Sequence, residues 1–342
     1  MRAVYFNSHG GVETLQVGEV PTPDPGPGQV LVRVTACGLN RLDLIVRSGS
    51  TPVKLKFPHI PGSEVAGVVH SLGVGVVGWE PGQRVVVAPY LNCGDCDYCL
   101  TGREEVCVRG DIVGLMRDGG YAEFVLAPAS SLVSIPDGLS DKEAAASTLS
   151  TLTAWHALVT RANVKPGESV LVLAAGSGVG SAAIQIAKLA GAQVIATAST
   201  EEKRVMAKDL GADIAISYLD GEMRGAVRRI SGKRGVDVVF EHVGGATWQR
   251  SLSCLARNGR LVICGTTSGT RGITDLWSLF AKQLNLLGTY GGTRAELAQV
   301  LSLTALGKLK AVIDREYPLE QAREAQERLR GRRQFGKILL IP

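Results

Sequence analysis

The sequence predicts an α/β protein with a β-rich part followed by a doubly wound parallel sheet, and three observations support this. The 342 residues are enough for two domains with a large core. Residues 1–130 contain short apolar runs broken by Gly and Pro, which is typical of strands in a partly open barrel. From Ser169 onward, apolar strands alternate with helical segments, which indicates a parallel sheet covered on both faces.

The β-rich part opens with a strand at the N-terminus, and an Ala-rich helical segment follows it at residues 140–163. Ser140 and Glu143 form a capping-box pair at the start of that segment. The C-terminal tail contains an amphipathic helix and a closing strand, which we expect to return to the first domain. The further strands expected in the β-rich part are residues 29–37, 64–73, 83–89 and 121–128.

The alternating part begins with the buried strand 169–175 and the helix 178–191, which ends at a glycine. Its last strand, residues 284–290, is apolar and could pair with its own copy across a two-fold axis, so we expect a homodimer or homotetramer. The expected domains are residues 1–150 with 291–342, and residues 151–290. Other strands are expected at residues 193–198, 213–218, 236–241 and 260–265, with a helix at 201–213.

The composition excludes several classes of protein. No apolar run reaches the ~18 residues of a membrane span. The N-terminus lacks a signal-peptide hydrophobic region, so we expect a cytoplasmic protein without a membrane partner. Net charge is only +5. The basic run at residues 328–337 is typical of a solvated helix end, and it lacks the interleaved aromatic residues of a nucleic-acid platform.

A glycine-rich turn between a strand and a helix predicts dinucleotide binding. In this context the backbone can approach a pyrophosphate at the helix N-terminus. The strict G-x-G-x-x-G pattern is absent, because its three positions hold Ala175, Ser177 and Gly180. The expected cofactor contacts are Ala175, Gly176, Ser177, Gly178, Val179 and Gly180.

The end of the next strand favours NADP(H) over NAD(H). It lacks the carboxylate that binds the ribose of NAD, and it is followed by Ser199, Lys203 and Arg204. The Lys203 and Arg204 side chains could contact a 2′-phosphate, and arginine offers the better fork for phosphate oxygens. Two alternatives remain: Ser199 and Glu202 also fit a capping box, and both basic residues could be ordinary surface charges.

Four cysteines with the spacing C-x2-C-x2-C-x7-C predict a metal site. Four thiolates close a tetrahedron around Zn²⁺ and leave no open position, so we expect one structural zinc per chain. A bacterial iron–sulfur run would have a shorter last gap followed by Pro, and disulfides are not expected in a reducing compartment. The predicted ligands are Cys93, Cys96, Cys99 and Cys107.

Several stretches together resemble the medium-chain dehydrogenase/reductase family, which includes the zinc-containing alcohol dehydrogenases. They extend over essentially the whole chain: "CGLNRLD", "IPGSEVAGVV", "GQRVVV", "CGDCDYCLTGREEVC", "GGYAEFV", "LTAWHAL", "AAGSGVG" and "FGKILL". The resemblance implies a nicotinamide-dependent oxidoreductase. It also implies a GroES-like catalytic domain that carries a structural-zinc lobe at about residues 92–108, and a Rossmann domain.

Zinc alcohol dehydrogenases of this family hold a second, catalytic zinc with a Cys, a His and a further Cys or carboxylate. By resemblance the first ligand matches Cys37, but the second falls on Ser63 and the third on Leu149. Neither a serine hydroxyl nor a leucine replaces imidazole and thiolate. A site rebuilt from Cys37, His59 and Glu64 remains an alternative.

These departures resemble the zinc-free quinone oxidoreductase branch, which reduces enones and quinones with NADPH. Hydride addition to an enone places negative charge on a distant oxygen, which hydrogen-bond donors can stabilise. By resemblance, Asn40 is the first candidate to line the substrate pocket. Asp43 could orient the substrate or pair with Arg41, and Ser63 and Tyr90 are weaker candidates to donate to a carbonyl.

The resemblance also places Lys203 and Tyr218 near the 2′-phosphate. Thr266 and Thr267 follow a Rossmann strand, where loops face the nicotinamide. Two other functions remain open: a zinc-dependent alcohol dehydrogenase or ketone reductase, and a crystallin-like protein that binds NADPH without turnover.

Overall fold

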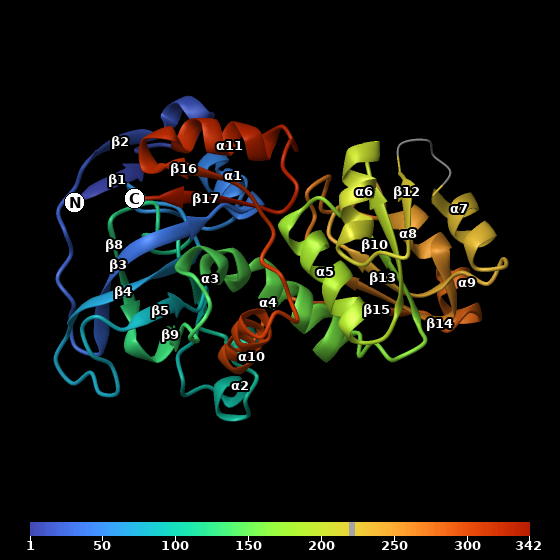
Figure 1. The fold of residues 1–342 in the computed structure, drawn as a ribbon, viewed down its shortest axis with the longest axis horizontal. Helices are drawn as coiled ribbons and strands as arrows, with labels where there is room; N and C mark the ends of the chain where they lie inside the picture. The colour runs from blue at the N-terminus through green and yellow to red at the C-terminus, as the bar shows by residue number, and fades with distance from the viewer. Residues whose placement is uncertain (219–222) are drawn as a thin grey trace. The chain divides into compact units, whose positions relative to one another are not determined.

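The computed structural model describes residues 1–218 and 223–342. The chain forms two compact units (Figure 1). The first contains residues 1–152, 292–307 and 311–342, and the second contains residues 153–291 and 308–310. In the described parts of the chain, no helix is both long and apolar enough to cross a membrane.

The first unit is built on a mixed sheet with the strand order β16-β17-β3-β4-β5-β9, in which β8 also pairs with β3. Neighbouring strands are antiparallel except for β16 and β17, so the C-terminal strand lies beside β3 from the N-terminal part of the chain. The inward side chains of β3 and β4 form the core with Phe6 and Tyr121. The strands are β3 (Gln29–Gly38), β4 (Glu64–Leu72), β5 (Arg84–Val87), β8 (Phe124–Pro128), β9 (Leu132–Ser134), β16 (Ile313–Pro318) and β17 (Lys337–Ile341).

Shorter elements complete this unit. Two small antiparallel pairs join β1 with β2 and β6 with β7. Their bounds are β1 (Arg2–Tyr5), β2 (Gln16–Glu19), β6 (Tyr90–Leu91) and β7 (Asp111–Ile112). The helices are α1 (Arg41–Ser48), α2 (Asp97–Leu100), α3 (Asp141–Thr148), α10 (Arg294–Ala305) and α11 (Ala322–Arg330).

The helical segment expected at residues 140–163 is interrupted. The predicted capping box is confirmed, because Ser140 accepts from the Glu143 N–H and Glu143 accepts from the Ser140 N–H. Helix α3 ends before Leu149, and α4 (Ser150–Trp155) continues into a π-helical turn. The helix is interrupted here because the Glu64 carboxylate accepts hydrogen bonds from the N–H groups of Leu149 and Ser150.

The second unit contains a parallel sheet with the strand order β12-β11-β10-β13-β14-β15, the doubly wound arrangement. Its strands are β10 (Ser169–Val172), β11 (Gln193–Ala198), β12 (Ile214–Ser217), β13 (Val236–Glu241), β14 (Leu255–Ile263) and β15 (Asn285–Gly288). Its helices are α5 (Gly178–Leu189), α6 (Glu201–Asp209), α7 (Met223–Ile230), α8 (Trp248–Cys254) and α9 (Leu276–Ala281). The order reverses between β10 and β13, where sheets of this kind bind ligands at the carboxyl ends of the strands.

Candidate active site and metal centre

The predicted dinucleotide turn lies between β10 and the N-terminus of α5 and collects residues 175–180 in one place. Ser177 caps the helix, and its hydroxyl accepts from the Gly180 N–H at 2.9 Å. A Cβ atom on Gly180 would lie 2.4 Å from the Ala174 carbonyl oxygen, so only glycine permits this strand–helix approach. The turn can therefore present backbone N–H groups to a pyrophosphate.

A histidine that the sequence did not single out packs against this turn. His242 follows β13 and is buried, and burial lowers the pKa of its ring. Its Nε2 lies 2.9 Å from the Leu173 carbonyl oxygen and 3.4 Å from Ser177 Oγ. Because a carbonyl only accepts, Nε2 of the neutral ring carries the proton and ties the ends of β10 and β13 together.

The loops after β13 and β14 form the neighbouring edge of the sheet. The fully buried Glu241 carboxylate accepts from the Val243 and Gly244 N–H groups, at 2.7 and 3.1 Å. The Ser268 N–H in turn donates to the Val243 carbonyl at 2.7 Å, so the two loops are joined. The predicted residues Thr266 and Thr267 lie exposed at this edge.

The residues predicted for the 2′-phosphate follow two paired strands. Ser199 and Tyr218 come directly after Ala198 and Ser217, which are partners in the β11–β12 ladder. The capping-box reading of Ser199 is wrong, because α6 begins one residue later and its cap is Thr200, which accepts from the Lys203 N–H at 3.2 Å.

The two basic residues of this group lie on α6, and both are half-buried. The Arg204 guanidinium donates to Glu201 at 2.5 and 3.0 Å, so this side chain already forms a local ion pair. Ser199 is also half-buried, at the end of β11.

The four predicted zinc ligands come together in the segment between β6 and β7. Their sulfur atoms are 3.4 Å apart for Cys93 and Cys107, 3.5 Å for Cys96 and Cys99, and 3.8–3.9 Å for two further pairs. Zn–S bonds of about 2.3 Å give a tetrahedral S–S edge of about 3.8 Å. The cluster therefore fits one zinc ion with four protein ligands.

Near the C-terminal end of β3, a buried ion pair lies at the centre of the predicted catalytic region. The Lys337 ammonium forms an ion pair with Glu64, with Nζ 2.6 Å from Oε2, and donates to Asn40 Oδ1 at 2.8 Å and to the Leu39 carbonyl at 2.5 Å. Lys337 is 4% exposed and Glu64 fully buried. The other Glu64 oxygen, Oε1, accepts from the N–H groups of Leu149 and Ser150.

Glycines allow this ion pair to form. A Cβ on Gly38 would lie 2.1 Å from Glu64 Oε2, and a Cβ on Gly336 would lie 2.3 Å from the Val312 carbonyl oxygen. Gly336 also has a φ of 93°, which favours glycine.

Asp43 supports Asn40 from inside the unit. Its carboxylate accepts from the Asn40 N–H at 2.7 Å and from the Tyr121 hydroxyl at 3.0 Å. Asp43 is fully buried, and burial raises the pKa of its carboxyl to about 6. Both of these hydrogen bonds are internal, and through them Asp43 holds the backbone of Asn40.

The positions that match the family's catalytic zinc ligands do not form a ligand set. Ser63 is buried and its hydroxyl has no hydrogen-bond partner among the described residues. The His59 Nε2–H group donates to the Gly114 carbonyl oxygen at 3.1 Å, and Nδ1 lies 3.7 Å from the Asp118 carboxylate. In residues 1–218 and 223–342, Cys93, Cys96, Cys99 and Cys107 are the one group of three or more potential ligands within 4.8 Å of one another.

The thiol at the first of these positions lies in a buried place close to two carboxyl groups. Cys37 is fully buried, and burial, with the nearby charges of Asp43 and Glu64, raises its pKa well above the usual range.

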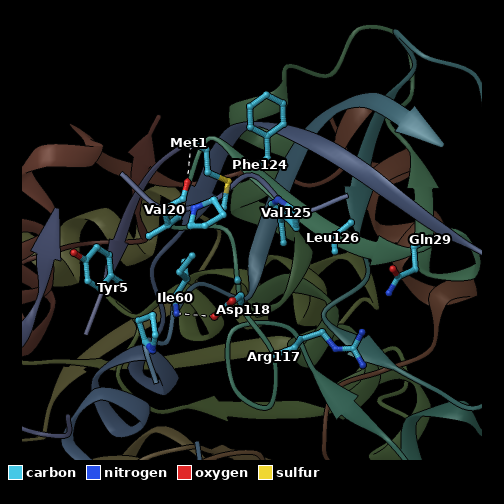
Figure 2. A pocket seen from close by; sticks show the side chains of 14 residues that line it. Met1, Tyr5, Val20, Gln29, Ile60, Arg117, Asp118, Phe124, Val125 and Leu126 are labelled. Carbon is cyan, nitrogen blue, oxygen red and sulfur yellow. Dashed lines mark hydrogen bonds between the residues drawn. The ribbon is translucent and has the colours of Figure 1, made fainter. Parts of the chain in front are cut away.

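A separate pocket of about 370 Å³ lies elsewhere in the first unit (Figure 2). Its lining is mostly apolar and includes Met1, Val20 and Phe124, and the Ile60 N–H donates to Asp118 at one wall. None of the lining residues is a predicted site residue.

Two family models match this chain. The family model described as "Alcohol dehydrogenase GroES-like domain" matches residues 26–137, and that described as "Zinc-binding dehydrogenase" matches residues 178–305. The chain therefore belongs to the medium-chain, zinc-type alcohol dehydrogenase-like family and is an oxidoreductase of that family.

Relatives with different activities are similar to this chain. It is 36% identical to an alcohol dehydrogenase of Geobacillus stearothermophilus over 95% of this chain and 96% of the relative. It is 32% identical to human quinone oxidoreductase, over 100% and 98%. It is 33% identical to an acryloyl-coenzyme A reductase of Metallosphaera sedula, over 99% of both chains.

Solved structures confirm the fold. An NAD-dependent alcohol dehydrogenase superimposes with a TM-score of 0.96 at 44% identity, covering both chains fully. Mycobacterial Rv1454c, solved in complex with NADPH, superimposes with a TM-score of 0.84 at 32% identity, again covering both chains fully.

Proposed function

We propose that this protein is an NADPH-dependent reductase of activated double bonds or quinones that works without a catalytic zinc. One observation carries the proposal: the Lys337 ammonium forms an ion pair with Glu64, which is the carboxylate that a rebuilt catalytic metal site would need. Ser63 and Leu149 stand where the family's His and third ligand would be. The donor set at this place does not suit a tetrahedral zinc.

The chemistry of such a substrate suits the residues present. The nicotinamide cofactor, when bound, supplies a hydride to the β-carbon of the enone and leaves in its oxidised form. Negative charge develops on the carbonyl oxygen, where Asn40 Nδ2 is the donor that we assign. A proton from solvent then completes the α-carbon. One well-placed donor of this kind is worth roughly 10²–10³ in kcat.

The choice of NADPH rests on the ends of β11 and β12. Ser199, Lys203, Arg204 and Tyr218 supply hydroxyls and positive charge, and the β11 end carries no carboxylate. The NADPH complex of the similar mycobacterial protein Rv1454c supports the same choice. The KM values for NADPH and NADH test it: a lower KM for NADPH is expected, and a lower KM for NADH would contradict it.

The rival function with a specific observation in its favour is a zinc-dependent alcohol dehydrogenase, because two similar proteins carry that name. An assay with a panel of substrates distinguishes these functions. Purified protein is mixed with NADPH and with enones, quinones and simple ketones. Oxidation of NADPH by the enones or quinones is expected. Turnover of simple ketones or alcohols alone would support the rival, and no turnover at all would favour a binding protein.

The partner proposed is a second copy of this chain. Strand β15 is the edge of its sheet. Large apolar side chains on and near α9 are exposed, among them Trp277 (71%) and Phe280 (61%), whose rings are in contact at 4.9 Å. Exposed edges and apolar patches of this kind usually serve an interface. Antiparallel pairing of β15 with its copy would cover both.

A further inference from the structure

The Lys337 ammonium lies within 2.8 Å of three oxygen atoms. It donates to the Asn40 side-chain oxygen and to the Leu39 carbonyl, and it forms an ion pair with the Glu64 carboxylate. An ammonium group cannot accept a hydrogen bond. The Asn40 oxygen must therefore face Lys337, whichever way the amide is drawn.

This contact determines what Asn40 can offer on its other side. With Oδ1 held by Lys337, the Nδ2 group points away from the ammonium. Its one contact among the described residues is the Gly38 carbonyl at 3.5 Å, which is long for a hydrogen bond. The amide is thus presented as a donor, the polarity needed at a developing enolate oxygen.

The backbone of Asn40 is fixed as well. Its N–H donates to Asp43 at 2.7 Å, and it is the N-cap of α1. Glu64 holds Lys337 and is itself bound to two backbone N–H groups, at 2.7 and 2.9 Å. The Asn40 amide is thus linked through Lys337, which lies 297 positions later in the sequence, to the buried Glu64 carboxylate.

We propose that Lys337 is a positioning residue, which holds the Asn40 amide so that its NH₂ group faces the carbonyl oxygen of the substrate. The inference rests on the proposed function and names the device that orients its donor. Lys337 does not touch substrate in this scheme. Its effect is transmitted through Asn40.

The test compares variants in the full-length protein, with kcat and KM for an enone and NADPH. Asn40→Asp keeps the oxygen that faces Lys337 but removes the donor, so kcat should fall roughly 10²–10³-fold while KM for NADPH stays unchanged. Lys337→Met combined with Glu64→Gln removes the ion pair without leaving a buried charge. In this pair kcat should fall about 10–100-fold, as for other positioning partners.

Coupling distinguishes positioning from mere structural support. In the Lys337→Met, Glu64→Gln background, Asn40→Asp should cost much less than in the native protein, because the amide is already misplaced. Lys337→Arg should recover most of kcat. Arg328→Met is the matched control: it breaks the Arg328–Asp314 pair, with oxygens at 2.6 and 3.0 Å, and should leave kcat unchanged. Full additivity, or an unchanged kcat in the double variant, would overturn the proposal.

A second readout does not depend on turnover. The side-chain NH₂ resonances of Asn40 are observed in protein labelled with ¹⁵N-asparagine and assigned by their loss in Asn40→Asp. They should shift in the Lys337→Met, Glu64→Gln variant and remain in Arg328→Met. Unchanged resonances in the double variant would overturn the positioning role. Failure of native protein to oxidise NADPH with any enone or quinone would instead overturn the proposed function.

Discussion

At the scale of single residues, the centre of the first unit depends on buried charge that is fully paired. Lys337 and Glu64 form an ion pair with 5% and 0% side-chain exposure. Removal of one partner from such a pair typically costs about 3–5 kcal/mol, whereas replacement of both by neutral groups costs far less. This asymmetry explains why the positioning test uses a paired substitution.

Asp43 gives a prediction for the pH dependence of stability. Burial raises its pKa from 3.8 to about 6. Between these values the folded state binds more protons than the unfolded state, so the contribution of Asp43 to stability is complete below the unfolded pKa. It decreases as pH rises through the folded value. Protonation would place a hydrogen on the carboxylate oxygen Oδ1, which has no hydrogen-bond partner among the described residues.

Asp43→Asn should remove this pH dependence, because an amide can keep both hydrogen bonds and carries no charge. Tm is measured for both proteins between the unfolded and folded pKa values. The native Tm should fall relative to that of the variant as pH rises across this window. Parallel Tm curves would show that Asp43 does not titrate there.

At the scale of elements, much of the fold could be predicted from local patterns. Apolar runs identified β3, β4 and β13 because each strand is buried and lies between turn residues. The break at Leu149 could not be predicted, since it is caused by Glu64, a carboxylate 85 residues away. The contact between Lys337 and Asn40 was missed for the same reason: no local pattern records it. The four cysteines were found because their ligand spacing is local.

The turn before α5 gives the prediction for an element. Gly180→Ala should cost about 1–3 kcal/mol, because its Cβ would lie 2.4 Å from the Ala174 carbonyl oxygen. It should also raise the Kd for NADPH. Gly225→Ala in α7 is the matched control, since the nearest atom to its Cβ is the end of the Arg229 side chain at 3.5 Å. Unfolding in urea and titration with NADPH measure both effects, and equal behaviour of the two variants would contradict the account.

At the scale of the whole molecule, each unit contributes a different kind of site. The second unit has a dinucleotide turn at its switch point, and the first has a cysteine cluster and a buried ion pair. Family resemblance predicted the class of enzyme, because its motifs extend along the chain. Within the family, the choice of a reductase without a catalytic zinc depends on a few side chains, above all Ser63 and Leu149 at the ligand positions.

Assembly gives the prediction at this scale. Trp277→Glu should convert the proposed dimer to a monomer, because a charge would be buried in an apolar interface. Light scattering during size-exclusion chromatography measures the mass of the assembly. Val77→Glu is the control: Val77 is 84% exposed in a different unit and should leave the mass unchanged. A native monomer, or a dimer unaffected by Trp277→Glu, would contradict this interface.

We propose that the four cysteines hold one structural zinc per chain and that reduction of the double bond needs no second metal. The decisive measurement is the zinc content of protein that oxidises NADPH with an enone. One zinc per chain, bound by Cys93, Cys96, Cys99 and Cys107, is the expected result. Two zinc ions per chain, with activity lost when one of them is removed, would contradict the account.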